Sequence, residues 1–229
     1  MRTHHRIRQN TDEWHDIRRG LFTSSNVYAL FSDPKTKRDK ELGKLSKTAQ
    51  TLVNEKAREV LEFDSTTFST KATEWGHYYE EYAANAYKEI FDVEIFEGDF
   101  WTLGENTGSS PDRLVFEKGL LEIKCHENQN EHIFNLQNIK NQKDLKIHRK
   151  EYYYQTQHQL YVTGREWCDF LSFDPRFFCN ELTVKAGFVC FRIFPEDSVF
   201  KDFETRIQIA SEMRDKVVND ILEYDINYL

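Results

Sequence analysis

Apolar residues recur with a helical period in several stretches of the chain. From Thr73 to Ile90 the aromatic and aliphatic side chains return every three or four positions, a spacing that predicts a long amphipathic helix. The same spacing predicts helices at 13–19, 49–61, 151–162 and 198–223. The expected apolar side of the last helix consists of Phe203, Ile207, Ala210, Val217 and Ile221. Hydroxyl side chains at 23–25 are expected to cap a further helix that runs to Phe31.

Between residues 93 and 125 the pattern changes to short β-rich runs. Consecutive strands are predicted at 93–103, 113–116 and 120–125, with a turn at 117–119 that closes a hairpin. Two further strands are expected at 167–173 and 187–194, and the polar residues 126–150 are expected to form a long connection with some helix. The sum predicts an α/β fold in one domain, residues 1–229, with a mixed central sheet flanked by helices.

Composition narrows the class of protein. A chain of 229 residues that is 39% hydrophobic can bury a substantial core. It has no apolar run long enough to span a membrane and no secretory signal at its N-terminus, so we expect a soluble intracellular protein. The four cysteines are dispersed, which argues against a disulfide framework and against a zinc or iron–sulfur cluster.

The formal net charge of −8 argues against a surface coated with positive charge for general nucleic-acid binding. Two stretches, 33–47 and 140–150, nevertheless carry more Lys and Arg than acids. Each is either a solvated loop or part of a local track for phosphates. The net charge therefore does not exclude a local basic channel.

Two acids and a lysine stand out in the predicted hairpin. Side chains alternate along a strand, so Glu122 and Lys124 share the face opposite Leu121 and Ile123. Asp112 precedes the partner strand and could lie near Glu122 across the pair. Two adjacent carboxylates repel each other unless a cation lies between them, and Mg²⁺ takes such oxygen ligands. The alternative is an edge hairpin with a solvated Glu–Lys face, and spacing alone leaves both open.

Six segments then match a known pattern in order along the chain. They are E-W-H-D-I-R-R-G-L-F-T-S-S (13–25), E-W-G-H-Y-Y-E (74–80), S-S-P-D (109–112), L-E-I-K-C (121–125), Q-T-Q (155–157) and F-D-P-R (173–176). The chain resembles the PD-(D/E)XK nuclease superfamily, and within it the phage lambda exonuclease and YqaJ-like viral recombinases, from about residue 11 to the C-terminal helix. The resemblance implies a restriction-endonuclease-like core.

The resemblance assigns a role to each matching residue of the catalytic motif. It implies that Asp112 and Glu122 bind a metal together with the carbonyl of Ile123, and that Lys124 is the catalytic lysine. Glu80 would help to hold the metal, and Gln157 would support the metal site or the attacking water. From the residues alone, Glu80 could be a solvated acid beside a packing glycine, Gly76, and Gln157 a buried hydrogen-bonding residue. The implied cofactor is Mg²⁺, with Mn²⁺ as a substitute.

The resemblance also implies a substrate. Arg18, Ser25 and Ser110 match positions that bind a 5′-terminal phosphate, although helix capping would equally explain Ser25. The implied activity is 5′-to-3′ digestion of one strand of duplex DNA, which releases mononucleotides and leaves 3′ single-stranded tails. The implied assembly is a homotrimeric ring that acts at DNA ends with a single-strand annealing protein. The implied setting is the cytoplasm of a bacterial host, for a protein encoded by a phage or prophage.

The chain departs from the family pattern at three places. No acid occurs at 100–102, before S-P-D, where family members often carry one; His126 follows Cys125 where a proline is frequent; and the segment 126–150 is long. The histidines of that segment, His126, His132 and His148, are expected to be solvated rather than metal ligands. The alternative functions are a structure-specific DNA endonuclease on the same fold, a non-catalytic DNA-end-binding module, and a hydrolase of small phosphoesters.

Overall fold

The structure is a computed structural model that describes residues 1–41, 44–63 and 70–224. Its strands are β1 (Arg2–His5), β2 (Phe22–Thr23), β3 (Ile95–Glu97), β4 (Phe100–Leu103), β5 (Thr107–Ser109), β6 (Arg113–Val115), β7 (Gly119–Cys125), β8 (Trp167–Phe173) and β9 (Phe188–Ile193). Its α-helices are α1 (Asp12–Ile17), α2 (Lys37–Glu41), α3 (Lys47–Val60), α4 (Lys71–Phe91), α5 (Gln129–Asn138), α6 (Gln142–His148), α7 (Lys150–Thr163) and α8 (Asp197–Leu222). Short 3₁₀ helices are η1 (Val27–Phe31), η2 (Pro175–Cys179) and η3 (Val184–Gly187).

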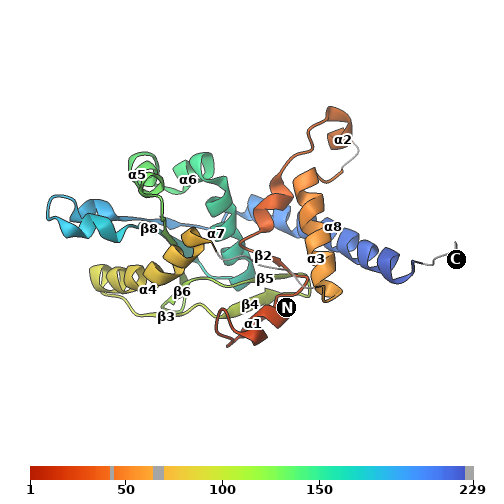
Figure 1. The fold of residues 1–229 in the computed structure, drawn as a ribbon, viewed down its shortest axis with the longest axis horizontal. Coiled ribbons are helices and arrows are strands. Elements are labelled where there is room, and N and C mark those ends of the chain that lie inside the picture. The colour runs from red at the N-terminus through yellow and green to blue at the C-terminus, as the bar shows by residue number, and fades with distance from the viewer. Residues whose placement is uncertain (42–43, 64–69, 225–229) are drawn as a thin grey trace.

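The strands form two sheets rather than the single sheet that the sequence predicted. A larger sheet has the order β3-β6-β7-β8-β9, and a smaller one has the order β1-β4-β5-β2. Each sheet is mixed: β7 and β8 are parallel in the first, and β2 and β5 are parallel in the second. Helices flank both sheets, so the α/β class is confirmed (Figure 1).

The predicted hairpin is the centre of the larger sheet. Strands β6 and β7 pair antiparallel, with Arg113 opposite Leu121. On one face of β7, Leu121 and Ile123 pack with Ala83, Ala84 and Tyr87 of α4 into a hydrophobic core. Helix α7 covers the other face. Strand β7 is therefore enclosed between two helices.

Two short connections join the two sheets, and these connections touch. Strands β3 and β4 lie in different sheets although only Gly98 and Asp99 separate them, and residues 110–112 separate β5 from β6 in the same way. A Cβ atom placed on Gly98 would lie 1.6 Å from the carbonyl oxygen of Pro111. Glycine is therefore required at this contact, which fixes the Ser-Ser-Pro-Asp segment between the sheets.

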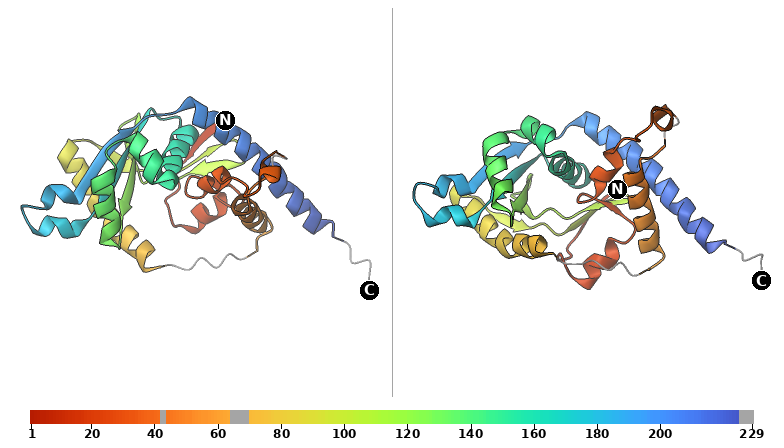
Figure 2. Two further views of the ribbon diagram at one scale, coloured as in Figure 1. Left: turned by 90° about the horizontal axis from the view of Figure 1, so that it is seen from above. Right: turned by 45° about the horizontal axis from the view of Figure 1, so that its top comes forward.

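Helix α8 packs along α3 and α7 and closes the larger core, where Phe203, Ile207 and Ala210 are buried as predicted. The predicted apolar side does not hold to the end of the helix, because Ile221 is 43% exposed and Val217 is only half-buried. The last turns of α8 project beyond the other described helices and strands (Figure 2). In the buried part, Arg214 donates a hydrogen bond of 2.7 Å to the carbonyl of Gly20.

Several other predictions changed in detail. The helix expected from 23–25 to Phe31 is a short 3₁₀ helix that begins at Val27, and strand β2 precedes it. Strands β1, β2 and β5 were not predicted, and the connection 126–150 contains two helices, α5 and α6. The helix over 73–90 is confirmed, but it packs through small residues and Tyr87, whereas Tyr78 and Tyr82 are 63% and 56% exposed.

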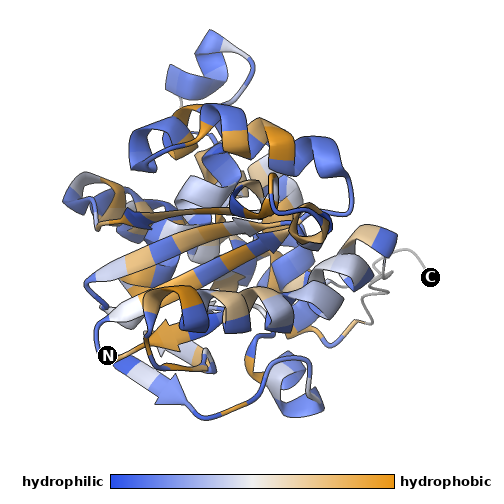
Figure 3. Ribbon diagram, turned by 90° about the vertical axis from the view of Figure 1, so that its left-hand side faces the viewer, coloured by the Kyte–Doolittle hydropathy of each residue, from blue (hydrophilic) through white to orange (hydrophobic). Residues whose placement is uncertain are grey.

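Hydropathy follows this architecture. Figure 3 shows hydrophobic residues concentrated on the strands and on the helix sides that face them, with hydrophilic residues over the outer turns and helix ends. No helix in the described part of the chain is long and apolar enough to cross a membrane.

Candidate functional site

The carboxylate of Glu122 is buried and fully hydrogen-bonded. Its side chain points from β7 toward α7, and the residue is 0% exposed. One oxygen accepts from the ammonium of Lys124 at 2.5 Å and from the amide of Gln155 at 2.6 Å, and the other accepts from Gln159 at 2.5 Å. The face that carries Glu122 and Lys124 is therefore polar, as predicted, but it is enclosed rather than solvated.

Asp112 lies beside this group, as the hairpin predicted. One of its carboxylate oxygens accepts a hydrogen bond of 2.6 Å from the backbone N–H of Ile123. Burial, with the adjacent carboxylates of Glu122 and Glu80, holds the pKa of Asp112 well above its usual range. A cation next to Asp112 would relieve this repulsion and favour its ionised form.

Glu80 completes the acidic group from the other side. It projects from α4, and its carboxylate accepts a hydrogen bond of 2.9 Å from Arg113. Burial raises the pKa of Glu80 against the opposing effect of Arg113. Burial lowers the pKa of Lys124, but the carboxylates of Glu122 and Asp112 outweigh it, so that the net pKa lies above the ordinary value. Lys124 is therefore an ammonium at neutral and alkaline pH.

The residues fit a hard divalent cation. Among the described residues, no group of three or more His, Cys, Asp and Glu side chains is arranged to hold a metal. Mg²⁺, however, typically takes only one or two carboxylates and completes its shell with water and phosphate oxygens. Asp112 and Glu122 are mutually repelling carboxylates beside the backbone of Ile123, and they supply such a set of oxygen donors.

A cavity of about 380 Å³ opens at these residues. Its lining from the sheet comprises Asp112, Ile123, Lys124, Cys125 and His126. The N-terminal half of α4 and Tyr152 of α7 supply further walls. Gly76 lies in this lining, and a Cβ atom there would meet only the carbonyl of Cys125 at 3.8 Å. The protein itself therefore leaves room above Gly76.

The structure does not bring Gln157 to the acidic group. Its side chain donates to the carbonyl of Phe194 at 2.8 Å and accepts from the N–H of Glu196 at 2.9 Å, so it ties α7 to the start of α8. The glutamines that contact Glu122 are Gln155 and Gln159, which the sequence analysis missed. Their spacing of four residues on a predicted helix places them on one face, and this signal could have found them.

Of the predicted phosphate-binding residues, Arg18 and Ser110 both contact Trp14. The guanidinium of Arg18 lies 3.7 Å from the ring centroid of Trp14, whose indole N–H donates to the Ser110 hydroxyl at 2.8 Å. Ser25 lies in the turn that follows β2, where its hydroxyl is 3.3 Å from that of Thr23.

The Arg18 side chain is available to a ligand. Among the described residues none accepts a hydrogen bond from its guanidinium, and burial lowers its pKa to about 10 against the opposing effect of Glu59. Because the Ser110 oxygen accepts from Trp14, its hydroxyl proton is also free to donate. An arginine fork beside free hydroxyls is a suitable site for a phosphate.

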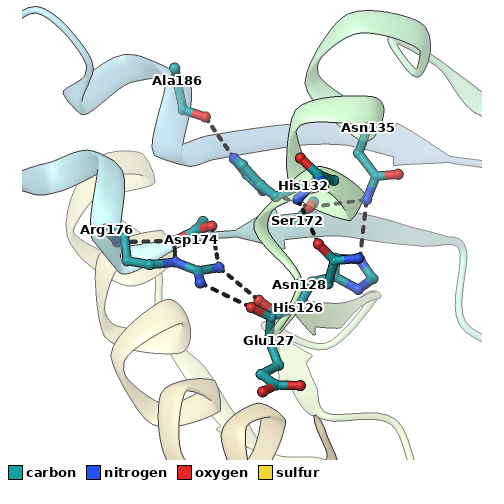
Figure 4. A network of polar contacts seen from close by, with 10 residues as sticks. His126, Glu127, Asn128, His132, Asn135, Ser172, Asp174, Arg176 and Ala186 are labelled. Carbon is teal, nitrogen blue, oxygen red and sulfur yellow. Dashed lines mark hydrogen bonds and ion pairs between the residues drawn. The ribbon is translucent and has the colours of Figure 1, made fainter.

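The F-D-P-R motif is a structural clamp. The guanidinium of Arg176 pairs with the Asp174 carboxylate at 2.7 Å and donates to the carbonyls of His126 and Glu127 at 3.0 and 2.9 Å (Figure 4). It therefore fixes the backbone that follows strand β7. The prediction that the histidines of 126–150 are solvated is wrong for His132, which is fully buried between Ser172 and the carbonyl of Ala186.

Several cations of the two basic stretches have local partners. Lys40 pairs with Asp33 and Lys44 with Asp39 in the first stretch. In the second, Lys146 pairs with Glu196 and Arg149 with Glu131. These pairs reduce the positive charge that either stretch can offer to a phosphate backbone.

The family model of the YqaJ-like viral recombinase domain matches residues 13–166. No curated protein sequence matches the chain. Among solved structures, the complex of LHK-Exo with dAMP is 27% identical to this chain, with a TM-score of 0.75 over 92% of this chain and 96% of the other.

Two further structures are similar. One is the alkaline exonuclease LHK-Exo from Laribacter hongkongensis, 27% identical, with a TM-score of 0.74 over 93% of this chain and 96% of the other. The other is a phage-related exonuclease from Haemophilus somnus 129PT, 19% identical, with a TM-score of 0.68 over 96% and 97% of the two chains. This last likeness shows the fold alone.

Proposed function

Because this chain belongs to the YqaJ-like viral recombinase family, we propose that it is a Mg²⁺-dependent exonuclease. It digests one strand of duplex DNA from a 5′-phosphorylated end, releases mononucleotides and leaves a 3′ single-stranded tail. The observation that carries this proposal is that Arg18 and Ser110, which both contact Trp14 and form the proposed phosphate pocket, lie close in the chain to the Asp112–Glu122–Lys124 group through Ser110.

The proposed phosphate pocket and the acidic group are close along the chain. Ser110 precedes Asp112 by two residues, so their Cα atoms are at most about 7 Å apart. A terminal phosphate in the pocket would therefore place the linkages nearest to the strand end beside the acids. The mononucleotide dAMP bound to the similar LHK-Exo supports a mononucleotide as the product.

Asp112, Glu122 and the carbonyl of Ile123 would hold the metal, with Glu80 nearby. When bound, Mg²⁺ lowers the pKa of a water and polarises a phosphoryl oxygen. Gln155 and Gln159 orient Glu122 through its two oxygens. Lys124 remains protonated, so its ammonium acts as a donor to charge that develops on the scissile phosphate and not as a general base.

The 5′-phosphate pocket explains why the proposed enzyme would require a DNA end. A terminal phosphate carries more negative charge than a bridging one, and Arg18 with the hydroxyls of Ser25 and Ser110 recognises that charge. Continuous DNA offers no such group. End recognition thus depends on residues that are separate from the metal ligands.

The proposal extends to the assembly and its setting. The protein forms a homotrimeric ring around DNA, with the stretches 33–47 and 140–150 as candidate linings, and works with a single-strand annealing protein. It acts in the cytoplasm of a bacterial host and is encoded by a phage or prophage. The family description as a viral recombinase supports the phage setting, whereas the ring and the annealing partner rest on the resemblance to the lambda exonuclease. Light scattering of the purified protein measures the number of subunits.

Digestion of a linear duplex labelled at either end tests the activity, with and without Mg²⁺, for wild type, Lys124→Ala and a control, Lys118→Ala. Lys118 is an exposed lysine that pairs with Glu166 on the surface. We expect Lys124→Ala to lower the rate about a hundredfold to a thousandfold, and Lys118→Ala to leave it unchanged.

Other outcomes identify other functions. Cleavage of covalently closed circular DNA would contradict end dependence and favour an endonuclease. Tight binding of ends without metal-dependent digestion would favour a binding module. Turnover of a small phosphodiester in the absence of DNA digestion would favour a phosphoester hydrolase.

A further inference from the structure

His126 follows the catalytic strand directly and lines the same cavity as Lys124, Asp112 and Glu80. One of its ring nitrogens, Nε2, lies 3.3 Å from the side-chain amide nitrogen of Asn135. The other ring nitrogen, Nδ1, faces away from Asn135 (Figure 4). No described residue forms a hydrogen bond with Nδ1, and it is not among the buried polar atoms that lack a partner. Nδ1 is therefore accessible from the cavity.

The proton positions around His126 follow from groups that can only donate or only accept. Arg149 has no acceptor, and its Nε donates to Oδ1 of Asn135 at 3.2 Å. The amide group of Asn135 must therefore point its NH₂ toward His126 and toward the Ser172 hydroxyl, 3.1 Å away. Because an NH₂ group only donates, Nε2 of His126 accepts.

The hydrogen bonds around His132 lead to the same orientation of the Asn135 amide. The carbonyl of Ala186 can only accept, so Nε2 of His132 donates to it at 2.7 Å. Neutral His132 then accepts through Nδ1 from the Ser172 hydroxyl at 2.9 Å. The Ser172 oxygen is left as the acceptor for Asn135. Both ends therefore require the same orientation of the Asn135 amide.

The charge state of His126 completes the assignment. Burial and the nearby Arg149 lower the pKa of His126 to about 4, so the imidazole is neutral at neutral pH. A neutral imidazole that accepts through Nε2 carries its proton on Nδ1. The cavity therefore contains a neutral N–H donor with a fixed direction, three residues after the Ile123 carbonyl.

We propose that His126 contacts the substrate through Nδ1–H, which donates a hydrogen bond to a phosphate oxygen of the DNA strand in the cavity, and that Asn135 is the positioning residue that fixes this proton. A phosphate oxygen is the fitting acceptor because the cavity already contains the acids, the lysine and room for a strand end. This inference rests on the proposed exonuclease function.

Two substitutions separate the two ring nitrogens. In His126→Asn, the amide NH₂ occupies the place of Nδ1 and retains a donor. In His126→Gln, the amide occupies the place of Nε2, so it retains the contact with Asn135 and loses the donor in the cavity. Digestion of a 5′-phosphorylated linear duplex by wild type, both variants, His126→Ala and the reference Lys124→Ala is measured under single-turnover conditions.

We expect His126→Gln and His126→Ala to digest about tenfold to a hundredfold more slowly than wild type, the effect of one hydrogen bond to a charged group, and His126→Asn to recover most of the rate. Thermal unfolding midpoints verify that the variants are folded, and recovery by Asn distinguishes a donor at Nδ1 from a general packing effect. Equal rates for Gln and Asn variants, or rates equal to wild type, would overturn the inference while leaving the exonuclease intact. If wild type itself fails to digest DNA, the proposed function is overturned and the inference with it.

Discussion

Trp14 and Ser110, 96 residues apart in the chain, are joined by a hydrogen bond of 2.8 Å from the indole nitrogen to the serine hydroxyl. This bond attaches the α1 region, which carries Arg18, to the segment that carries Asp112. The face of the same indole supports the Arg18 guanidinium. One tryptophan thus positions both the cation and a hydroxyl of the proposed phosphate pocket.

Arg18→Ala is expected to remove the preference for phosphorylated ends. Its charge-assisted hydrogen bonds to a phosphate are worth about 1.5–3 kcal/mol, so the ratio of rates on 5′-phosphate and 5′-hydroxyl duplexes should fall by about tenfold to a hundredfold. Arg19→Ala is the control, because Arg19 is exposed and pairs with Asp16. An unchanged ratio in Arg18→Ala would remove this residue from end recognition.

Gln159→Met is expected to impair chemistry, whereas Gln157→Met is expected to impair stability. Loss of a residue that orients a metal ligand typically costs about 10- to 100-fold in metal affinity or activity, so Gln159→Met should require more Mg²⁺ and digest more slowly. Among the described residues, the side chain of Gln157 bonds only backbone groups, at 194 and 196. Its replacement should lower the free energy of unfolding by about 1–3 kcal/mol.

Titration of digestion rate against Mg²⁺, alongside denaturant unfolding, measures both variants. The reverse result, with Gln157→Met defective in metal dependence at normal stability, would restore Gln157 to the site. It would also indicate that α7 turns relative to β7 when DNA binds.

Gly98→Ala is expected to destabilise the protein by about 1–3 kcal/mol or more, as overpacking does, because its Cβ would lie 1.6 Å from the Pro111 carbonyl oxygen. The new Cβ atom would displace the Ser-Ser-Pro-Asp segment, which carries Asp112, so the digestion rate should decrease as well. Gly76→Ala is the matched control, with only an ordinary contact at 3.8 Å, and it should stabilise helix α4 by up to about 1 kcal/mol. Thermal unfolding that places the two variants in the opposite order would contradict this account.

Acid should destabilise the protein through His158. This histidine is fully buried between Ser24 and Thr107, at 2.8 and 2.9 Å, and burial lowers its pKa to about 3. The unfolded chain therefore binds a proton below about pH 6.5 that the folded protein does not bind. Stability contributed by the neutral ring is complete above that pH and declines as the pH falls toward 3, by about 2 kcal/mol at pH 5.

Denaturant unfolding at pH 8 and pH 5 measures this effect. His158→Gln should lower stability at both values, because it disturbs a buried hydrogen-bonded site. The loss between pH 8 and pH 5 should nevertheless be about 2 kcal/mol smaller than in wild type. An equal pH dependence in the two proteins would assign the acid sensitivity to other groups.

Much of the site could be predicted because it depends on local periodicity. Alternation along β7 fixed the face of Glu122 and Lys124, and the hairpin placed Asp112 beside them. Gln157 was assigned by resemblance alone. It lies two residues from each of the glutamines that contact Glu122, which places it on a different side of the helix. The general lesson is that a motif of alternating glutamines requires the helix phase to decide which members face the strand.

The two-sheet arrangement could not be predicted in the same way. The run 93–103 was predicted as one continuous strand and strand β5 was not predicted at all; the contact between Gly98 and Pro111 shows where the chain passes from one sheet to the other. Long-range partners also determine the burial of His132. It lies in a polar segment of the sequence, yet it is buried against residues 40 and 54 positions away. Sequence patterns in one segment contain no information about such partners.

The crossing at Ser110, Pro111 and Asp112 has a consequence for the length of the product. In the proposed enzyme, Ser110 follows a strand of one sheet and Asp112 precedes a strand of the other, so the three consecutive residues 110–112 act as a ruler that sets the distance between the strand end and the acids. Side-chain substitutions can change the affinity at either end of this ruler without changing its length. A nuclease of this design can therefore evolve new substrates freely, but to remove two nucleotides at a time it would have to gain or lose residues within the Ser-Ser-Pro-Asp segment.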